Sequence, residues 1–151
     1  MMIKTKTFIT AICGVAFVLF SFKGDKDALD RKIYTLQVNE IKDGQARNKK
    51  PMEDELEFKD GRLISTFLMA KVSDQFKWIK YKVTKDSTYD DEGTQRRWLE
   101  AQGMFTNDLD ETIQVNVKVD EYDIDGSYKL TKHDVPKKLF EFVGKEKVKK
   151  K

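Results

Sequence analysis

Cysteine, histidine and proline are nearly absent from this chain. Its 151 residues include one cysteine, one histidine and two prolines. The single cysteine, Cys13, excludes an intramolecular disulfide framework, a zinc-type cysteine cluster and a redox CxxC pair. A folded domain of this sequence must therefore be held together by its apolar core, and the chain is long enough to bury a sizeable one.

Long apolar runs are also lacking, except at the start of the chain. Lys4 and Lys6 precede an apolar run over residues 8–22, and polar sequence begins at Lys23. A basic start, a short apolar run and an abrupt polar switch are typical of a secretory signal peptide, whereas a membrane span needs roughly 20 apolar residues. We expect residues 1–24 to be a signal peptide and the protein to be exported. A lipid anchor on Cys13 and an uncleaved N-terminal anchor remain alternatives.

The charge balance gives no sign of a nucleic-acid partner. The chain carries 29 Lys and Arg against 26 Asp and Glu, and residues 1–24 hold three lysines and no acid, which leaves 26 of each sign. Lysines crowd the last seven residues, so the body before them is mildly acidic and lacks a net basic footprint for nucleic acid. We expect membrane contact only through the signal peptide or weakly through the basic tail, residues 145–151.

Alternation of apolar and polar residues is the dominant pattern after residue 24. Tyr34, Leu36 and Val38 alternate with polar neighbours, and apolar residues alternate in the same way over 113–119. This period of two is typical of half-buried antiparallel strands. An Asp-Gly pair at residues 60–61 between two apolar runs is a strong hairpin signal. Eight strands are predicted: 33–41, 53–58, 62–70, 77–84, 95–106, 111–119, 122–131 and 137–144.

Eight consecutive strands joined by short turns predict an all-β fold. An up-and-down antiparallel sheet of this size loses its two exposed edges when it closes into a barrel. The inside of an eight-stranded barrel is either filled by side chains or holds one small ligand. A sandwich is the alternative, with the loops around 46–52 and 86–94 as its crossing connections. In either case we expect one domain over residues 25–144, followed by the tail.

Three segments carry a resemblance to a known family. They are DELEFKDGRL at residues 54–63, YDIDGSYKL at 122–130 and FEFVG at 140–144. Their order resembles that of a family of small exported bacterial proteins with a lipocalin-like barrel, and the similarity spans roughly residues 33–145. The resemblance implies a lipocalin-like fold, a periplasmic or extracellular location and, by analogy, a small hydrophobic ligand. The chain departs from the better-known lipocalins because its first strand has no Gly-x-Trp.

Few residues suggest catalysis or metal binding. His133 lies in a predicted turn beside Asp134, and a general base needs a substrate within reach and a partner that orients it. The run Asp123-x-Asp125-Gly126 resembles part of a calcium loop, but Lys132 stands where a bidentate glutamate is required. The sequence therefore predicts no enzyme, no catalytic residue, no metal and no cofactor. A hydrolase would require His133 to face a cleft that contains Asp or Glu.

Aromatic residues in the central strands lead to two hypotheses of binding. In the first, a monomer holds a small hydrophobic or amphipathic molecule inside the barrel by apolar burial. Its expected ligand-binding residues are Trp78, Tyr81, Trp98 and Phe105, with Arg97 as the partner of an anionic group.

The second hypothesis is a barrel filled by its own side chains that acts through surface contacts in the cell envelope. Phe76 and Trp78 have the opposite parity to the apolar residues that follow them, so these strands carry apolar side chains on both faces. The contact surface would then be Phe76, Trp78 and the basic tail. The alternation shows which residues share a face and leaves open which face points inward.

Overall fold

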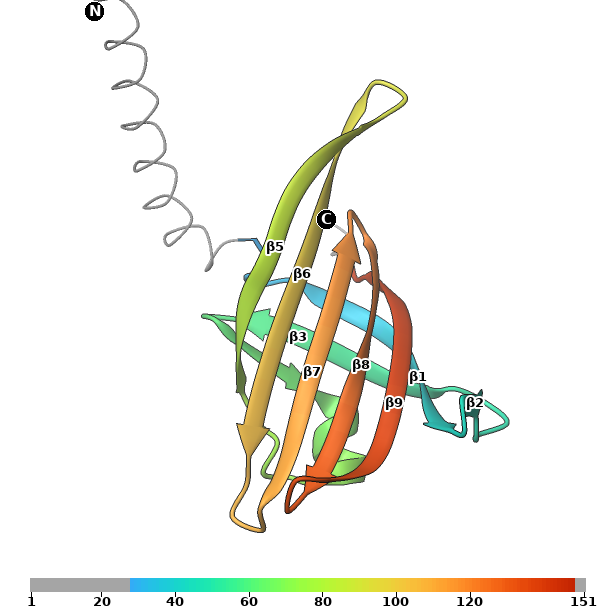
Figure 1. The fold of residues 1–151 in the computed structure, drawn as a ribbon. Helices are drawn as coiled ribbons and strands as arrows, with labels where there is room; N and C mark the ends of the chain where they lie inside the picture. The colour runs from blue at the N-terminus through green and yellow to red at the C-terminus, as the bar shows by residue number, and fades with distance from the viewer. Residues whose placement is uncertain (1–27, 149–151) are drawn as a thin grey trace, which may run out of the picture.

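The computed structural model describes residues 28–148. The predicted signal peptide and the last three residues of the predicted tail lie outside the described residues. Figure 1 shows the elements in chain order: β1 (Ile33–Lys42), β2 (Gln45–Ala46), β3 (Met52–Lys59), β4 (Arg62–Ser65), the short π-helix η1 (Leu68–Val72), β5 (Ile79–Asp91), β6 (Thr94–Thr106), β7 (Glu111–Asp120), β8 (Asp123–Lys132) and β9 (Val135–Glu146). Within residues 28–148, no helical segment reaches the length and apolar character that crossing a bilayer requires.

The strands form one antiparallel sheet that closes in a ring. Neighbours follow chain order from β3 to β9, and β1 pairs with both β3 and β9. The β1–β9 pairing is long, whereas β4 and β5 meet only at Arg62↔Lys80 and Leu63↔Ile79. The predicted all-β, up-and-down order is confirmed. A single closed sheet also excludes the two stacked sheets of a sandwich.

The tight turns follow the Asp-Gly and Glu-Gly pairs of the sequence. Asp60 and Gly61 both have positive φ, 52° and 75°, as do Glu92 and Gly93, 50° and 86°. Positive φ at both central residues is the signature of the two-residue turn that matches the twist of paired strands, and glycine adopts it without steric cost. The predicted hairpin around residues 60–61 is confirmed as the β3–β4 connection.

The predicted strand 62–70 is wrong beyond Ser65, where the chain turns into a helix. Ser65 is fully buried, and its hydroxyl accepts a hydrogen bond from the Leu68 backbone N–H at 3.1 Å. The Asp54 carboxyl group accepts a bond from the Phe67 N–H at 3.0 Å. These side-chain acceptors replace the partners that a continuing strand would need, so the chain leaves the ladder.

The predicted loop around 86–94 is wrong as well, because β5 and β6 continue through it as a long hairpin. The hairpin projects from the ring at the top of Figure 1. Every residue from Thr84 to Arg97 is exposed. Neither face of this segment is buried, so its sequence lacks the alternation of apolar and polar residues that predicts a strand.

Both ends of the described chain join the sheet more closely than the sequence predicts. Ala28 and Leu29, which precede β1, are buried in the core. The Arg31 N–H donates to the Phe58 carbonyl at 2.7 Å. At the other end β9 continues to Glu146, so the first two residues of the predicted tail belong to the ring.

Candidate binding surface

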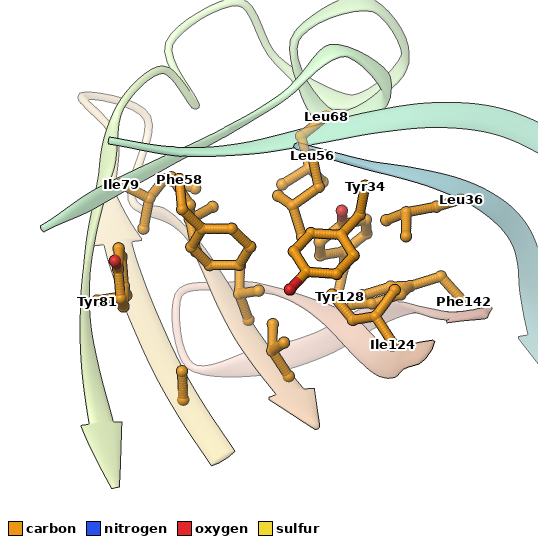
Figure 2. Packing of buried hydrophobic residues seen from close by; sticks show 14 of the residues in the cluster. Tyr34, Leu36, Leu56, Phe58, Leu68, Ile79, Tyr81, Ile124, Tyr128 and Phe142 are labelled. Atoms are coloured by element: carbon orange, nitrogen blue, oxygen red, sulfur yellow. The ribbon is translucent and has the colours of Figure 1, made fainter. Parts of the chain in front are cut away.

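The inside of the ring is filled by side chains. Tyr34, Phe58 and Tyr81 form a chain of edge-to-face contacts, with ring centroids 5.9 Å and 5.0 Å apart. Tyr128 and Phe142 pack with their centroids 4.7 Å apart. In Figure 2 these side chains come from strands on opposite sides of the ring and point toward one another. The interior is therefore a packed aromatic core.

One carboxyl group lies within this core and links three strands. Asp54 on β3 is 4 % exposed and accepts hydrogen bonds from the Ser65 hydroxyl at 2.8 Å and the Tyr128 hydroxyl at 2.6 Å. Burial and the neighbouring Asp54 raise the pKa of Tyr128 well above its ordinary value. Sequence reasoning missed this cluster. The alternation of residues could have indicated it, because Asp54 lies on the same, apolar face of its strand as Leu56 and Phe58.

A second buried hydroxyl has no such partner. Tyr34 is fully buried, and its hydroxyl makes no hydrogen bond with any described residue. Burial is the main reason that the pKa of Tyr34 lies above its ordinary value, and Glu146 adds to the shift. The interior is thus apolar around this group.

The hollows that carry polar side chains lie on the outer face of the sheet. The larger one, here called the basic hollow, has a volume of about 720 Å³ and crosses β4, β5, β6 and β7. Arg62, Lys80 and Lys82 are exposed in it, each next to a buried residue of the same strand. Its lining residues are Asp60, Gly61, Arg62, Lys80, Tyr81, Lys82, Thr84, Gln102, Gly103, Met104 and Gln114.

Cations at the edge of the basic hollow stand directly opposite one another. Lys59 on β3 is paired in register with Arg62 on β4, which is paired in turn with Lys80 on β5. Within residues 28–148, no carboxylate oxygen lies within ion-pairing distance of these three side chains. Like charges directly opposite on one face of a sheet destabilise the pairing.

A smaller hollow adjoins the basic hollow at Trp78. Its volume is about 430 Å³, and Lys59, Asp60, Arg62 and Trp78 line it. Asp60 and Arg62 belong to both hollows. Trp78 has φ of 52°, a backbone conformation that is unusual for a bulky residue. It leaves the tryptophan half-buried directly before β5.

A third hollow continues the basic one toward β8 and β9. This polar hollow has a volume of about 610 Å³ and shares Thr84 and Gln102 with the basic hollow. Its lining mixes both charges: Asn39, Ile41, Thr84, Glu100, Ala101, Gln102, Asn116, Val117, Lys118, Asp125, Gly126, Ser127, Glu141, Phe142 and Val143. The outer face therefore offers a basic end and a mixed, polar continuation.

The expected ligand-binding residues lie in different places. Tyr81 is buried in the core, and Phe105 lies at its rim against Phe76, with ring centroids 6.3 Å apart. Trp98 stands next to the buried Leu99 on the opposite face of β6, where Lys85 Nζ lies 5.6 Å from its ring centroid. One set of five side chains thus divides between the two faces of the sheet.

Arg97 and Trp78 complete that set. The Arg97 guanidinium makes a bidentate pair with the Asp86 carboxylate on the projecting hairpin. The donor fork of Arg97 is therefore already occupied by a neighbouring acid of the chain. Of the five residues, Tyr81 and Trp78 line these hollows, and only Trp78 is not part of the buried core.

The remaining candidates form no cluster that suggests chemistry. His133 is exposed in the β8–β9 turn, and its Nδ1 lies 2.7 Å from Asp110 Oδ2 on the neighbouring turn. Phe76 is fully buried and is therefore not part of a contact surface, contrary to the second hypothesis. Among residues 28–148, no three His, Cys, Asp or Glu side chains are grouped so that they could hold a metal ion.

Comparisons with models of protein families, with curated proteins and with solved structures find no match to this chain.

Proposed function

We propose that this chain is an exported, non-catalytic binding module, built on a lipocalin-like barrel, that recognises its partner through the outer face of β4–β8. The observation that carries this proposal is the packing of the ring. Its inner face is occupied by aromatic and aliphatic side chains, whereas the hollows with exposed polar groups lie outside. A carrier of a small apolar molecule would instead need an inner pocket, commonly of about 300–1,000 Å³.

Export is proposed from the pattern of residues 1–24. A signal peptide would be removed, and every residue of the described core lies after residue 27. Cleavage near residue 25 would therefore leave the packed segment intact. Edman sequencing of protein recovered from the periplasm or medium should begin close to Asp25. An intact Met1 on membrane-bound protein would contradict this part of the proposal.

The decisive experiment is native mass spectrometry of the protein purified after export by its own leader. We expect the mass of the polypeptide alone, unchanged after incubation with a panel of fatty acids and isoprenoids. A stoichiometric mass excess that disappears on denaturation would overturn the proposal and identify a cargo inside the ring.

The stability of two variants tests whether the inside of the ring is filled by side chains. Val115 is fully buried on β7, and the neighbouring Gln114 lies on the outer face. In a filled ring Val115→Phe should lower the free energy of unfolding by about 1–3 kcal/mol, because an overpacked core forces neighbours out of place. Gln114→Phe should have little effect. Equal stability of both variants in urea titrations would show that the ring has room to spare.

A further inference from the structure

We infer that the basic hollow, with Trp78 beside it, binds a segment of an acidic polysaccharide. This inference rests on the proposed function, because it names the partner of the outer face. It follows from three features: the unpaired cations in the basic hollow and at its edge, the tryptophan in the adjoining hollow, and a row of amides that leads from the basic hollow into the polar hollow.

The cations are arranged at a cost to the fold that an anion would offset. On the outer face some lysines are paired with an acid, as Lys85 is with Glu100 at 3.8 Å, and others, such as Lys129 and Lys138, are not paired with any acid of residues 28–148. Lys59, Arg62 and Lys80 stand side by side across three strands, and none of them has an acid within 4.0 Å among the described residues. Like charges directly opposite one another destabilise the pairing of the strands. A carboxylate or sulfate on Arg62 would remove this repulsion and use the planar donor fork of its guanidinium.

The tryptophan lies next to that anionic position. Arg62 borders both the basic hollow and the hollow of Trp78. The left-handed backbone at Trp78 is unfavourable for so large a residue, and the tryptophan remains only half-buried. An acidic sugar presents a charged group at the edge of a flat ring with an apolar C–H face. The charged group would bind Arg62 while the C–H face lies on the indole.

The amides extend the site across the sheet. Lys82 is paired in register with Gln102, and Gln102 with Asn116, so one lysine and two amides form a row across β5, β6 and β7. An amide side chain both donates and accepts, as a sugar hydroxyl does. A peptide that binds by adding a strand needs a free sheet edge. At Gln102 and Asn116 the strand edges are already paired, and the hollow is concave and so does not fit a flat membrane surface.

Binding should be measured by isothermal titration of the purified protein with oligomers of a polyuronate. The comparison probes are a neutral glucan of the same length, poly-L-glutamate of the same charge and anionic phosphatidylglycerol vesicles. We expect saturable binding of the polyuronate, together with a change in tryptophan fluorescence, and weaker or absent binding of the other three.

Matched variants separate the site from net charge. Arg62→Gln with Lys80→Gln should weaken polyuronate binding by about tenfold or more, the effect of losing a charge-assisted contact. Lys129→Gln with Lys138→Gln removes the same charge elsewhere on the outer face, and it should leave the affinity within about twofold because both side chains are exposed and lie outside the basic hollow. Trp78→Phe, checked for folding by its urea midpoint, should weaken binding and abolish the fluorescence change.

Four outcomes would overturn the inference. They are equal losses in the two double variants, equal affinity for poly-L-glutamate, equal affinity for the vesicles, or no binding of any probe. None of these yields the cargo mass that would overturn the proposed function, so failure of the inference and failure of the proposed function can be told apart.

Discussion

Two carboxyl groups show how differently the inside of the ring and the projecting β5–β6 hairpin use the same chemistry. Asp54 is buried, and donors from Ser65, Tyr128 and the chain at Phe67 surround it. Asp86 lies on the hairpin and faces Arg97 in a bidentate pair, and both side chains are more than a third exposed. Each carboxyl group has good partners, yet the environments differ.

The difference lies in what replaces a lost partner. On the hairpin, water can solvate whatever a substitution leaves behind, so an ion pair there contributes little. Inside the ring the donors are buried away from bulk water, so each donor left without a partner carries a desolvation cost. The inner contacts should therefore determine stability, which leaves the outer residues available for recognition.

The largest expected effect comes from breaking the inner cluster. Asp54→Ala leaves the hydroxyls of Ser65 and Tyr128 and the Phe67 N–H unpaired in the core. At about 1–3 kcal/mol for each unpaired group, we expect a loss of at least about 3 kcal/mol in the free energy of unfolding. Urea titration followed by tryptophan fluorescence measures it. Asp54→Asn keeps one acceptor oxygen, so its free energy of unfolding should fall by less. A loss below about 1 kcal/mol for Asp54→Ala would contradict the idea that burial makes these contacts important for stability.

An intermediate effect is expected at alkaline pH. Burial raises the pKa of Tyr34 and of Tyr128 in the folded protein, while the unfolded chain releases its phenolic protons near pH 10. Above that pH the unfolded state binds fewer protons than the folded state, so stability should be level below about pH 10 and fall as pH rises further.

Tyr34→Phe isolates one of these two groups. Because the Tyr34 hydroxyl has no hydrogen-bond partner among the described residues, its removal should cost little at pH 8. Above about pH 10 the variant should lose stability less steeply, by about 1.4 kcal/mol per pH unit, since one fewer proton is involved. Urea midpoints between pH 8 and pH 11 test this expectation, and parallel curves for the variant and the parent would argue against it.

The smallest effect is expected on the hairpin. Asp86→Asn and Arg97→Gln, alone or together, should each change the free energy of unfolding by about 0.5 kcal/mol or less, because both groups are solvated. Urea titrations at low and high salt measure the change. A loss above about 2 kcal/mol would mean that the hairpin is packed into the fold and would remove the contrast with Asp54.

Local chemistry made most of the strands predictable. Alternation identifies β1, β7 and β8, and the Asp60-Gly61 pair marks the β3–β4 hairpin. The predicted strands are wrong where a long-range contact or the lack of a buried face overrides the alternation of apolar and polar residues. At residues 66–70, acceptors from Asp54 and Ser65 redirect the chain into a helix. In the exposed part of the β5–β6 hairpin no buried face imposes an alternation.

The candidate surface was far less predictable. The sequence predicts Trp78 as a binding residue but not Arg62, Lys80 and Lys82, because their proximity depends on the register between β4 and β5. Arg97 was singled out and is paired with Asp86 eleven residues earlier in the chain, on the other strand of its hairpin. The predicted site was chosen mainly from aromatic residues, and it therefore combines side chains from both faces of the sheet.

By itself the sequence determined the all-β class, the strand order and the tight turns, because alternation and positive φ are properties of neighbouring residues. It also set which side chains share a face. Only the tertiary structure decided which face is inside, because that choice depends on β1 meeting β9 and closing the ring around the aromatic side chains. The Asp60-Gly61 turn sets Lys59 opposite Arg62, whereas only the pairing of β4 with β5 brings Lys80 beside them.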